Sequence, residues 1–495
     1  MEKISSIYTI VSVSVLSLLI CGLSACSSRP NDAILQSRLP HIYPDYAGVT
    51  IPVGIAPMNF NIVEADEEDA YVEVEGSKSG NLKSTGCLAH FDVNEWHDFV
   101  AQNRGGQLLF KVYVKRSGEW YSYRPFSMYV SKYTLGEWGM TYRLVAPSYE
   151  IFSKMGIYQR NLSNFDEEAI LENTQVPGMC INCHTSNRTN PDAFTFHVRG
   201  EHGATFVRYN GRDEWLKAKN EKLGGSMVYP YWHPSGRYCA FSTNDTHQMF
   251  HSTPHERIEV YDKKSDVLVY DVAHRRILTD SLISTKDWSE NIPVFSPDGK
   301  SLYFVSARQQ IYPEDYKKQR YNLCRISFDA ATGKFGNKVD TLIDAASMGK
   351  SITWPRPSYD GRYIMYTLMD YGYFSVWHNE SDLWLLDLKT GENRPLRDVN
   401  SKRSESLHNW NINSHWFFFT SRRDDGLYTR IYFSSIDDHG KVTKPFLLPQ
   451  QNPLVYYRRL MYSYNTPDFT LKPVKLNARK AGEVIESDER IETRF

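Results

Sequence analysis

The stretch Val294-Phe-Ser-Pro-Asp-Gly-Lys-Ser-Leu-Tyr-Phe-Val-Ser306 places a tight turn between two apolar, aromatic-rich segments. Related stretches begin at Tyr231, at Arg356 and, in a degenerate form, at Asn409. Three of these four copies share a glycine at the same place, in the order Gly236, Gly299 and Gly361, with spacings of 63 and 62 residues. A glycine supplies the positive φ that such a turn requires. A further pair of strands is expected after each copy, so each repeat predicts about four strands.

Four-stranded repeats with a period above 40 residues are typical of β-propeller blades. The copies resemble the Ser-Pro-Asp-Gly blades of TolB-like propellers over roughly residues 190–470. Residues 194–208 are expected to supply one more blade, and residues 454–457 to close another. We therefore expect five to seven blades and prefer six. The alternative is an unrelated β-sandwich that uses common turns.

The composition also favours an all-β protein. The chain has 495 residues, of which 41% are hydrophobic and 14% aromatic, which supports a large core and favours strands over a helical bundle. Its 57 basic residues nearly balance its 58 acidic residues, and no basic block stands out. A nucleic-acid-binding protein normally carries a basic patch, so we exclude a nucleic-acid partner.

The N-terminus has the features of an export signal. Residues 1–25 begin with Lys3, continue with an apolar run over residues 10–20, and read as a signal peptide. Leu23-Ser24-Ala25-Cys26 resembles the bacterial lipobox, which implies that Cys26 carries lipid and tethers the mature chain to a membrane. The residue after Cys26 is Ser27, not the aspartate of an inner-membrane retention signal, so we expect the outer membrane, facing the periplasm. An ordinary signal peptide with an incidental cysteine is the alternative.

We expect the mature chain to have five parts. Residues 26–45 are a polar spacer, and residues 46–160 form a β-sandwich-like domain with one helix over residues 93–102 and a hairpin turn at residues 116–119. Residues 161–190 form a linker for haem c attachment that begins with a short helix near residues 165–171. Residues 191–470 form the propeller, and residues 471–495 are a loose, charged tail.

The chemical signal in the chain is Cys180-Ile181-Asn182-Cys183-His184. Two thiols three residues apart can each add to one vinyl group of the same haem, and the adjacent histidine can bind its iron. We therefore predict one covalent haem c, with Cys180 and Cys183 as anchors and His184 as proximal iron ligand. Three alternatives stay open: a redox dithiol or disulfide, a zinc site completed by His197 or His202, and a chance match.

The sixth iron ligand is less defined by the sequence. His197 lies 13 residues after His184 and is our candidate distal ligand, although its alternation with aromatic residues also fits a packed strand position. Other candidates are Met179, Met227 and the loop residues His247, Met249, His251 and His255. An imidazole ligand would give a lower reduction potential than a methionine.

The whole arrangement resembles exported bacterial lipoproteins that join a Cys-x-x-Cys-His segment to TolB-like blades. The resemblance implies haem binding and electron transfer with a redox or envelope protein partner. The alternative is a propeller scaffold that binds a protein or glycan, with the haem structural, sensory or absent. A haem enzyme would need an open iron position and a distal acid–base pair, and the sequence offers no such pair, so we assign no catalytic residue.

Overall fold

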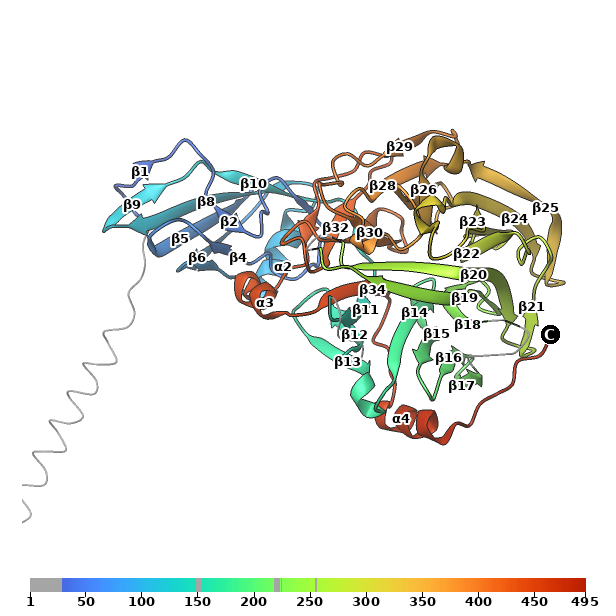
Figure 1. Cartoon of the computed structure of the whole chain (residues 1–495). Helices are drawn as coiled ribbons and strands as arrows, with labels where there is room; N and C mark the ends of the chain where they lie inside the picture. Colours follow the sequence, from blue (N-terminus) through green and yellow to red (C-terminus); the bar gives the residue numbers. More distant parts are fainter. Residues whose placement is uncertain (1–28, 148–153, 218–222, 224, 254–255) are drawn as a thin grey trace, which may run out of the picture.

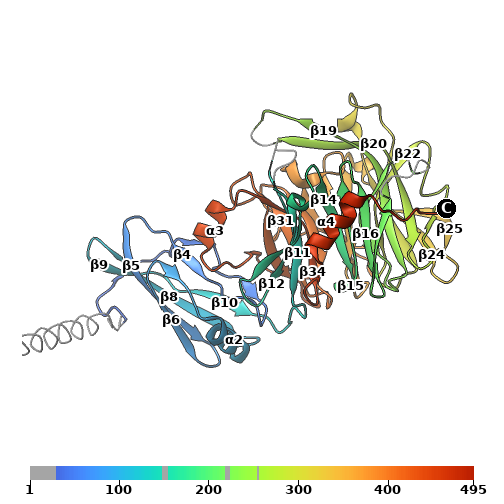
Figure 2. The same cartoon turned by 90° about the horizontal axis from the view of Figure 1, so that it is seen from below.

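A computed structural model describes residues 29–147, 154–217, 223, 225–253 and 256–495. It contains a smaller N-terminal β-domain and a large β-propeller, which lie side by side in Figures 1 and 2. The expected all-β fold, with a sandwich-like domain followed by a propeller, is confirmed. The signal peptide and Cys26 lie outside the described residues.

The N-terminal domain consists of two sheets and one helix. In its larger sheet β5 pairs with β6 and β8, and β8 pairs with β9 and β10. The strands are β1 (Ile34–Leu35), β3 (Thr50–Ile51), β5 (Glu67–Gly76), β6 (Asn81–Thr85), β8 (Gln107–Arg116), β9 (Glu119–Ser122) and β10 (Phe126–Val130) in the larger sheet, and β2 (Ile42–Tyr43), β4 (Phe60–Ile62) and β7 (Leu88–Ala89) in the smaller. Helix α2 (Val93–Gln102) is capped by the Asp92 side chain and buries Trp96, Phe99 and Val100, as predicted.

Six four-stranded sheets form the propeller, which confirms the preferred blade number. From the inner to the outer strand, blade 1 is β14 (Cys180–Asn187), β15 (Asn190–Arg199), β16 (Ala204–Tyr209) and β17 (Arg212–Lys217); blade 2 is β18 (Ser226–Trp232), β19 (Tyr238–Phe250), β20 (Ile258–Asp271) and β21 (Arg276–Leu278); blade 3 is β22 (Trp288–Phe295), β23 (Ser301–Arg308), β24 (Asn322–Asp329) and β25 (Lys334–Ile343). Blade 4 is β26 (Ser351–Pro357), β27 (Tyr363–Met369), β28 (Asp382–Asp387) and β29 (Asn393–Pro395); blade 5 is β30 (Glu405–Trp410), β31 (Trp416–Ser421), β32 (Arg430–Ser435) and β33 (Phe446–Leu447); blade 6 is β34 (Ser463–Thr470), β11 (Gly139–Val145), β12 (Gly156–Asn161) and β13 (Glu167–Glu172).

The sixth blade closes the ring with strands from two distant parts of the chain. Its inner strand β34 pairs with β11, so a late segment completes a sheet begun more than 300 residues earlier. The inner strands of successive blades are neighbours, and β34 lies between β30 and β14. Ring closure therefore depends on one antiparallel pairing between β11 and β34.

The repeated turns have the conformation that the sequence predicted. Gly236, Gly299 and Gly361 all adopt positive φ, between 72° and 75°, and Ser414 takes the same place in blade 5 with φ 64°. In blade 3 the Ser296 hydroxyl donates to Asp298 at 2.6 Å, which fixes the turn from within. Each turn joins the first and second strands of its blade.

One continuous core joins the N-terminal domain to blade 5. The Tyr46 hydroxyl donates to the Leu447 carbonyl at 3.0 Å, and the Trp416 indole donates to the Tyr133 carbonyl at 3.2 Å. The rings of Tyr133 and His415 stack with centroids 3.6 Å apart. These contacts position the domain against the outside of the propeller, where Figure 1 shows it beside β32.

Three sequence predictions about elements are wrong. Residues 165–171 do not form a helix, because Glu167–Glu172 pairs with β12 as the outer strand of blade 6. Residues 454–457 are not a strand but part of helix α3 (Pro453–Arg459). The tail is not loose: α4 (Ala478–Ser487) buries Ala481 and Ile485, and Ile491 pairs with Leu216.

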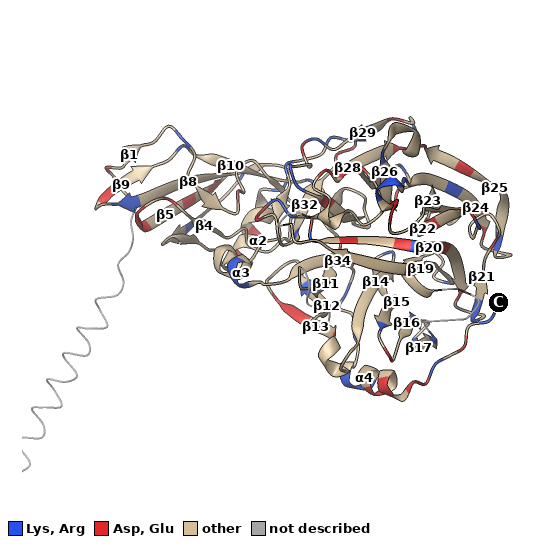
Figure 3. Cartoon of the chain, in the orientation of Figure 1, with Lys and Arg blue, Asp and Glu red and all other residues tan. Residues whose placement is uncertain are grey.

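The N-terminal domain also ends earlier than residue 160, because β11 and β12 belong to blade 6. Short 3-10 turns occupy Asn173–Gln175, Tyr316–Lys318, Ala346–Met348 and Ser375–Trp377. Among the described helices, none has the length and apolar character needed to cross a membrane. In Figure 3 the positions of acidic and basic residues are interspersed along the ribbon of both domains.

Replacing Phe469 in β34 tests the closure of the ring. Phe469 is fully buried, with its ring centroid 4.4 Å from that of Phe418. We expect Phe469→Ala to lower the free energy of unfolding by about 3–5 kcal/mol, because a large cavity replaces the ring. Leu471→Ala, at a side chain 40% exposed just after the strand, should change it by less than about 0.5 kcal/mol. Urea unfolding followed by tryptophan fluorescence measures both, and equal effects would contradict this placement of β34.

Candidate functional site

A ring of six β-bulges surrounds the propeller axis. In every blade the inner strand contains two residues opposite one residue of the second strand. The first residue of each pair has positive φ, between 39° and 52°, in the order Cys183, Tyr229, Ile292, Trp354, Leu407 and Thr466. Left-handed backbone is unfavourable for residues with a side chain, by about 1–3 kcal/mol each, so six such bulges indicate a strong common constraint.

The residue types around the bulges repeat from blade to blade, as the backbone conformation of the bulges does. The residue opposite each bulge is a buried phenylalanine or tyrosine, in the order Phe196, Phe241, Phe304, Tyr366, Phe419 and Tyr142. The second bulge residue is proline in four blades, at positions Pro230, Pro293, Pro355 and Pro467. Proline suits this place because a bulge interrupts the ladder of backbone hydrogen bonds.

The Cys-x-x-Cys-His motif lies in this ring, and the prediction of an irregular linker for it is wrong. Cys180 opens β14, and the pair Cys183–His184 is the bulge of blade 1. The motif is thus built into the inner wall of the propeller. The structure brings both thiols to the wall of one cavity, while the histidine side chain borders a second, adjoining cavity.

Two histidines take the place that proline holds in the other blades. They are His184 in blade 1 and His408 in blade 5, on either side of β34. Both are almost fully buried, and burial lowers the pKa of each to about 3, so both rings are neutral at pH 7. The Nδ1 atom of each ring has no hydrogen-bond partner. His408 is not among the site residues expected from the sequence, although an alignment of the residues that precede the four turns places it at the same position as the prolines.

The wide cavity has a volume of about 190 Å³, room for about six water molecules. Cys180, Asn182 and Cys183 form one side of it, with Arg143 and Arg199 beside them. The opposite walls are mainly apolar and aromatic, and include Trp354, Phe374, Trp377, Val260 and Leu407. A cavity with an apolar body and a few convergent polar groups is the usual form of a small-molecule site.

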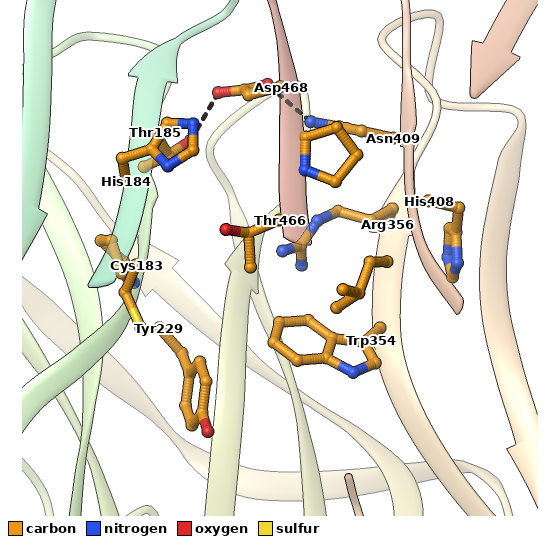
Figure 4. Close-up of a pocket in the computed structure, with 13 residues that line it drawn as sticks. Cys183, His184, Thr185, Tyr229, Trp354, Arg356, His408, Asn409, Thr466 and Asp468 are labelled. Atoms are coloured by element: carbon orange, nitrogen blue, oxygen red, sulfur yellow. Dashed lines mark hydrogen bonds between the residues drawn. The ribbon is translucent and has the colours of Figure 1, made fainter. Parts of the chain in front are cut away.

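A narrower cavity of about 40 Å³ lies at the bulges themselves (Figure 4). The Cys183 sulfur points toward Tyr229, whereas the His184 ring lies on the side of Asp468. His184 Nε2 is 3.0 Å from the hydroxyl of Thr141. Asp468 accepts hydrogen bonds from Thr185, the Ser186 backbone and Asn409, and burial raises its pKa to about 6. This space has room for about one water.

The structure does not bring His197 to either cavity. Its side chain lies on the same face of blade 1 as Asn182, fully buried, with Nδ1 3.2 Å from the Thr205 hydroxyl. Burial lowers its pKa to about 3, and its Nε2 has no partner. His202 lies near Asp488. His247 and Met249 lie on β19, His251 follows that strand, and His255 is outside the described residues.

The described cysteines of the mature chain are all free thiols, including Cys180 and Cys183. Burial raises the pKa of the Cys183 thiol. Within the described residues, no group of three His, Cys, Asp or Glu side chains is arranged to hold a metal ion. The zinc alternative therefore gains no support from His197 or His202.

These residues fit the attachment of a haem in part. Two free thiols border one cavity with an apolar wall, and neutral His184 offers a nitrogen lone pair, the form that binds iron. A porphyrin is larger than the wide cavity and would extend through its mouth. His184 faces the narrower cavity, so its fit as proximal ligand is weaker than the fit of the two thiols as anchors.

The hairpin of β19 and β20 covers the wide cavity, and Figure 1 shows it running across the propeller. A buried polar cluster fixes it to blade 4. His378 Nε2 lies 3.2 Å from Glu259 Oε2 on β20, its Nδ1 lies 3.0 Å from Glu380 Oε1, and the Tyr371 hydroxyl donates to Glu259 at 3.1 Å. Although burial opposes it, the hydrogen bonds that the protonated ring donates to the two glutamates raise the pKa of His378 to about 9.

Comparisons with known proteins add nothing finer than the fold. No protein-family model matches the chain, and no curated protein matches it in sequence. It is similar to a puromycin-hydrolysing peptidase of Mycobacterium tuberculosis, with 13% identity, a TM-score of 0.37, and coverage of 85% of this chain and 57% of that one. It is also similar to the β-propeller domain of the Trilobed protease of Pyrococcus furiosus, with 11% identity, a TM-score of 0.33, and coverage of 69% and 82%. The chain thus spans little more than half of the peptidase.

The buried cluster around His378 should make the stability of the folded protein depend on pH. Because the folded-state pKa of His378 is raised to about 9, its contribution to stability is complete below about pH 6.5 and is lost as the pH rises through 9. We expect the urea midpoint of wild type to be higher than that of His378→Gln. This difference should be greatest at pH 6.5 and smallest at pH 9.5. His439→Gln, at an exposed loop position, should show no such trend. A difference that stays constant across this range would contradict the assignment.

Proposed function

We propose that this protein is a monohaem c-type electron-transfer lipoprotein of the cell envelope, with a TolB-like propeller as the body that holds the haem. The observation that carries the proposal is the position of Cys180 and Cys183, which border one cavity as free thiols. Each thiol would add across one vinyl group, with sulfur bonding one carbon and the thiol hydrogen passing to the other. The addition needs no oxidant.

The chain would supply the environment of the haem through three sets of residues. Cys180 and Cys183 would hold it through thioether bonds, the wall at Trp354 and Trp377 would exclude water, and the neutral imidazole of His184 would be the iron donor nearest in sequence. A bound haem supplies a one-electron redox centre whose potential depends on its axial ligands. The β19–β20 hairpin limits access, so electrons would pass to a protein partner docked at the cavity mouth.

A second candidate is a redox-active dithiol, in which Cys180 and Cys183 form a disulfide. One contact favours it: Arg143 Nη2 lies 3.5 Å from Cys180 Sγ, and a cation beside the sulfur is typical of reactive cysteines. In this case the propeller would exchange two electrons and two protons with a dithiol partner, and the bound haem would be absent.

Expression with a working haem-attachment system tests the proposal. We expect wild type to gain the mass of one haem and a Soret band, and its pyridine haemochrome spectrum to report two thioether bonds. Cys183→Ser should lose the second bond, whereas Cys87→Ser, at a half-buried thiol of the N-terminal domain, should keep both. A bare polypeptide mass with no Soret band would refute the haem, and a mass lower by two hydrogens would favour the dithiol.

We also propose that the chain is exported and lipidated at Cys26, on the lipobox resemblance described above. Wild type should incorporate labelled palmitate and sediment with the outer membrane. Cys26→Ser should lose both properties, because the thiol is the point of attachment. Ser27→Asp tests the sorting residue separately: it should keep the lipid label and shift the protein to the inner membrane. Palmitate labelling of Cys26→Ser equal to wild type would contradict this assignment.

A further inference from the structure

We propose that Arg143 and Arg199 form an anion-binding end of the wide cavity, and that the ligand of this cavity carries a carboxylate on a flat, apolar body. The inference concerns the same cavity as the proposed function and names the chemistry of its occupant. A haem with its propionates is one such occupant, and a free aromatic carboxylate is another.

The two arginines come from different blades and meet at Cys180. Arg199 lies directly opposite Cys180 in the pairing of β15 with β14, so both side chains lie on the same face of blade 1. Arg143 belongs to β11 in blade 6, and its Nη2 lies 3.5 Å from both Cys180 Sγ and Met155 Sδ. Both guanidinium groups therefore converge on the thiol end of the cavity.

Within the part of the chain that the structure describes, neither arginine has an ion-pair partner. Among the described residues, no carboxylate oxygen lies within 4.0 Å of the nitrogens of Arg143 or Arg199. The Nε atom of Arg143 is buried and has no hydrogen-bond partner. The charge of Arg199 acts on Asp262, but the oxygens of Asp262 already accept hydrogen bonds from Asn244, Thr246 and Asn291.

Arg143 and Arg199 are partly buried, so each cation has lost some of its hydration without gaining a close carboxylate partner among the described residues. A bound anion would remove this unfavourable term, since a guanidinium pairs well with a carboxylate through two parallel hydrogen bonds. Burial raises the pKa of the Cys183 thiol, so Cys183, the partner of Cys180 in the motif, does not supply a negative charge that balances the arginines. The arginines therefore favour a ligand that brings its own negative charge.

The remaining wall defines the body of the ligand. Trp354, Phe374 and Trp377 line the cavity with Val260 and Leu407, and the Arg422 guanidinium lies over the Trp377 ring, 3.4 Å from its centroid. A small hydrophilic anion would leave this surface in contact with water, whereas a flat apolar ligand would cover it. The combination of one charged end and one aromatic wall selects an amphiphilic, planar carboxylate.

Paired ligands that differ only in charge test the inference. We would use the mature protein made without haem attachment, and titrate it with haemin against haemin dimethyl ester, and with 2-naphthoate against 2-naphthamide. Wild type should bind at least one acid about 10- to 100-fold more tightly than its neutral counterpart, because charge-assisted hydrogen bonds have about this effect on Kd. Arg199→Gln should abolish the preference, and Arg199→Lys should keep part of it.

Arg208→Gln is the matched control, since Arg208 lies on the adjacent strand β16 and already pairs with Asp213 at 2.7 Å. It should leave the preference for the acid unchanged. Without ligand, Arg199→Gln should melt at about the same temperature as wild type, because it removes a partly buried cation that has no ion-pair partner among the described residues. A purely structural Arg199 would instead give a lower melting temperature and no change in the charge preference.

The outcomes separate this inference from the haem proposal. If 2-naphthoate binds in an Arg199-dependent way while no haem attaches to the protein, the arginine site stands and the haem proposal fails. If haem attaches but neither acid is preferred over its neutral form in wild type, the arginine site is refuted and the haem proposal stands. Absence of binding by every probe refutes the arginine site.

Discussion

The arrangement of the propeller depends on the bulge that every inner strand carries next to the axis. In each bulge one residue adopts the left-handed backbone conformation and lies opposite a buried aromatic ring, from Phe196 in blade 1 to Tyr142 in blade 6. The bulges increase the local twist of the strands and re-aim their side chains toward the axis. Because six blades share this feature, the channel is lined by the same backbone geometry all round, and only its side chains differ.

That shared geometry gives the Cys-x-x-Cys-His segment a structural setting. Cys183 and His184 fill positions where the neighbouring blade has Tyr229 and Pro230. The backbone there requires a bulge but not a cysteine or a histidine, so these side chains are free to serve chemistry. His408 differs from the other blades in the same way, because it too occupies a position where most blades have proline.

The sequence predicted the blades that are local in the chain, and failed where distant segments pair. The turns at Gly236, Gly299 and Gly361 identified blades 2 to 4, because a positive φ has a clear residue signature. Blade 6 stayed hidden, since its strands come from both ends of the propeller and β13 reads locally as an acidic helix start. The thiols were found from their spacing alone, whereas Arg143 and Arg199 join the site only through sheet pairing.

The late strand β34 sets an order of events for the growing chain. Cys183 emerges from synthesis far ahead of residues 463–470, yet in the finished ring its side chain is only 9% exposed. On the proposed function, an attachment enzyme would need to reach both thiols, and the closed wall leaves little access to Cys183. Haem attachment would therefore precede the docking of the last inner strand, and a chain that folded first would keep its motif unmodified.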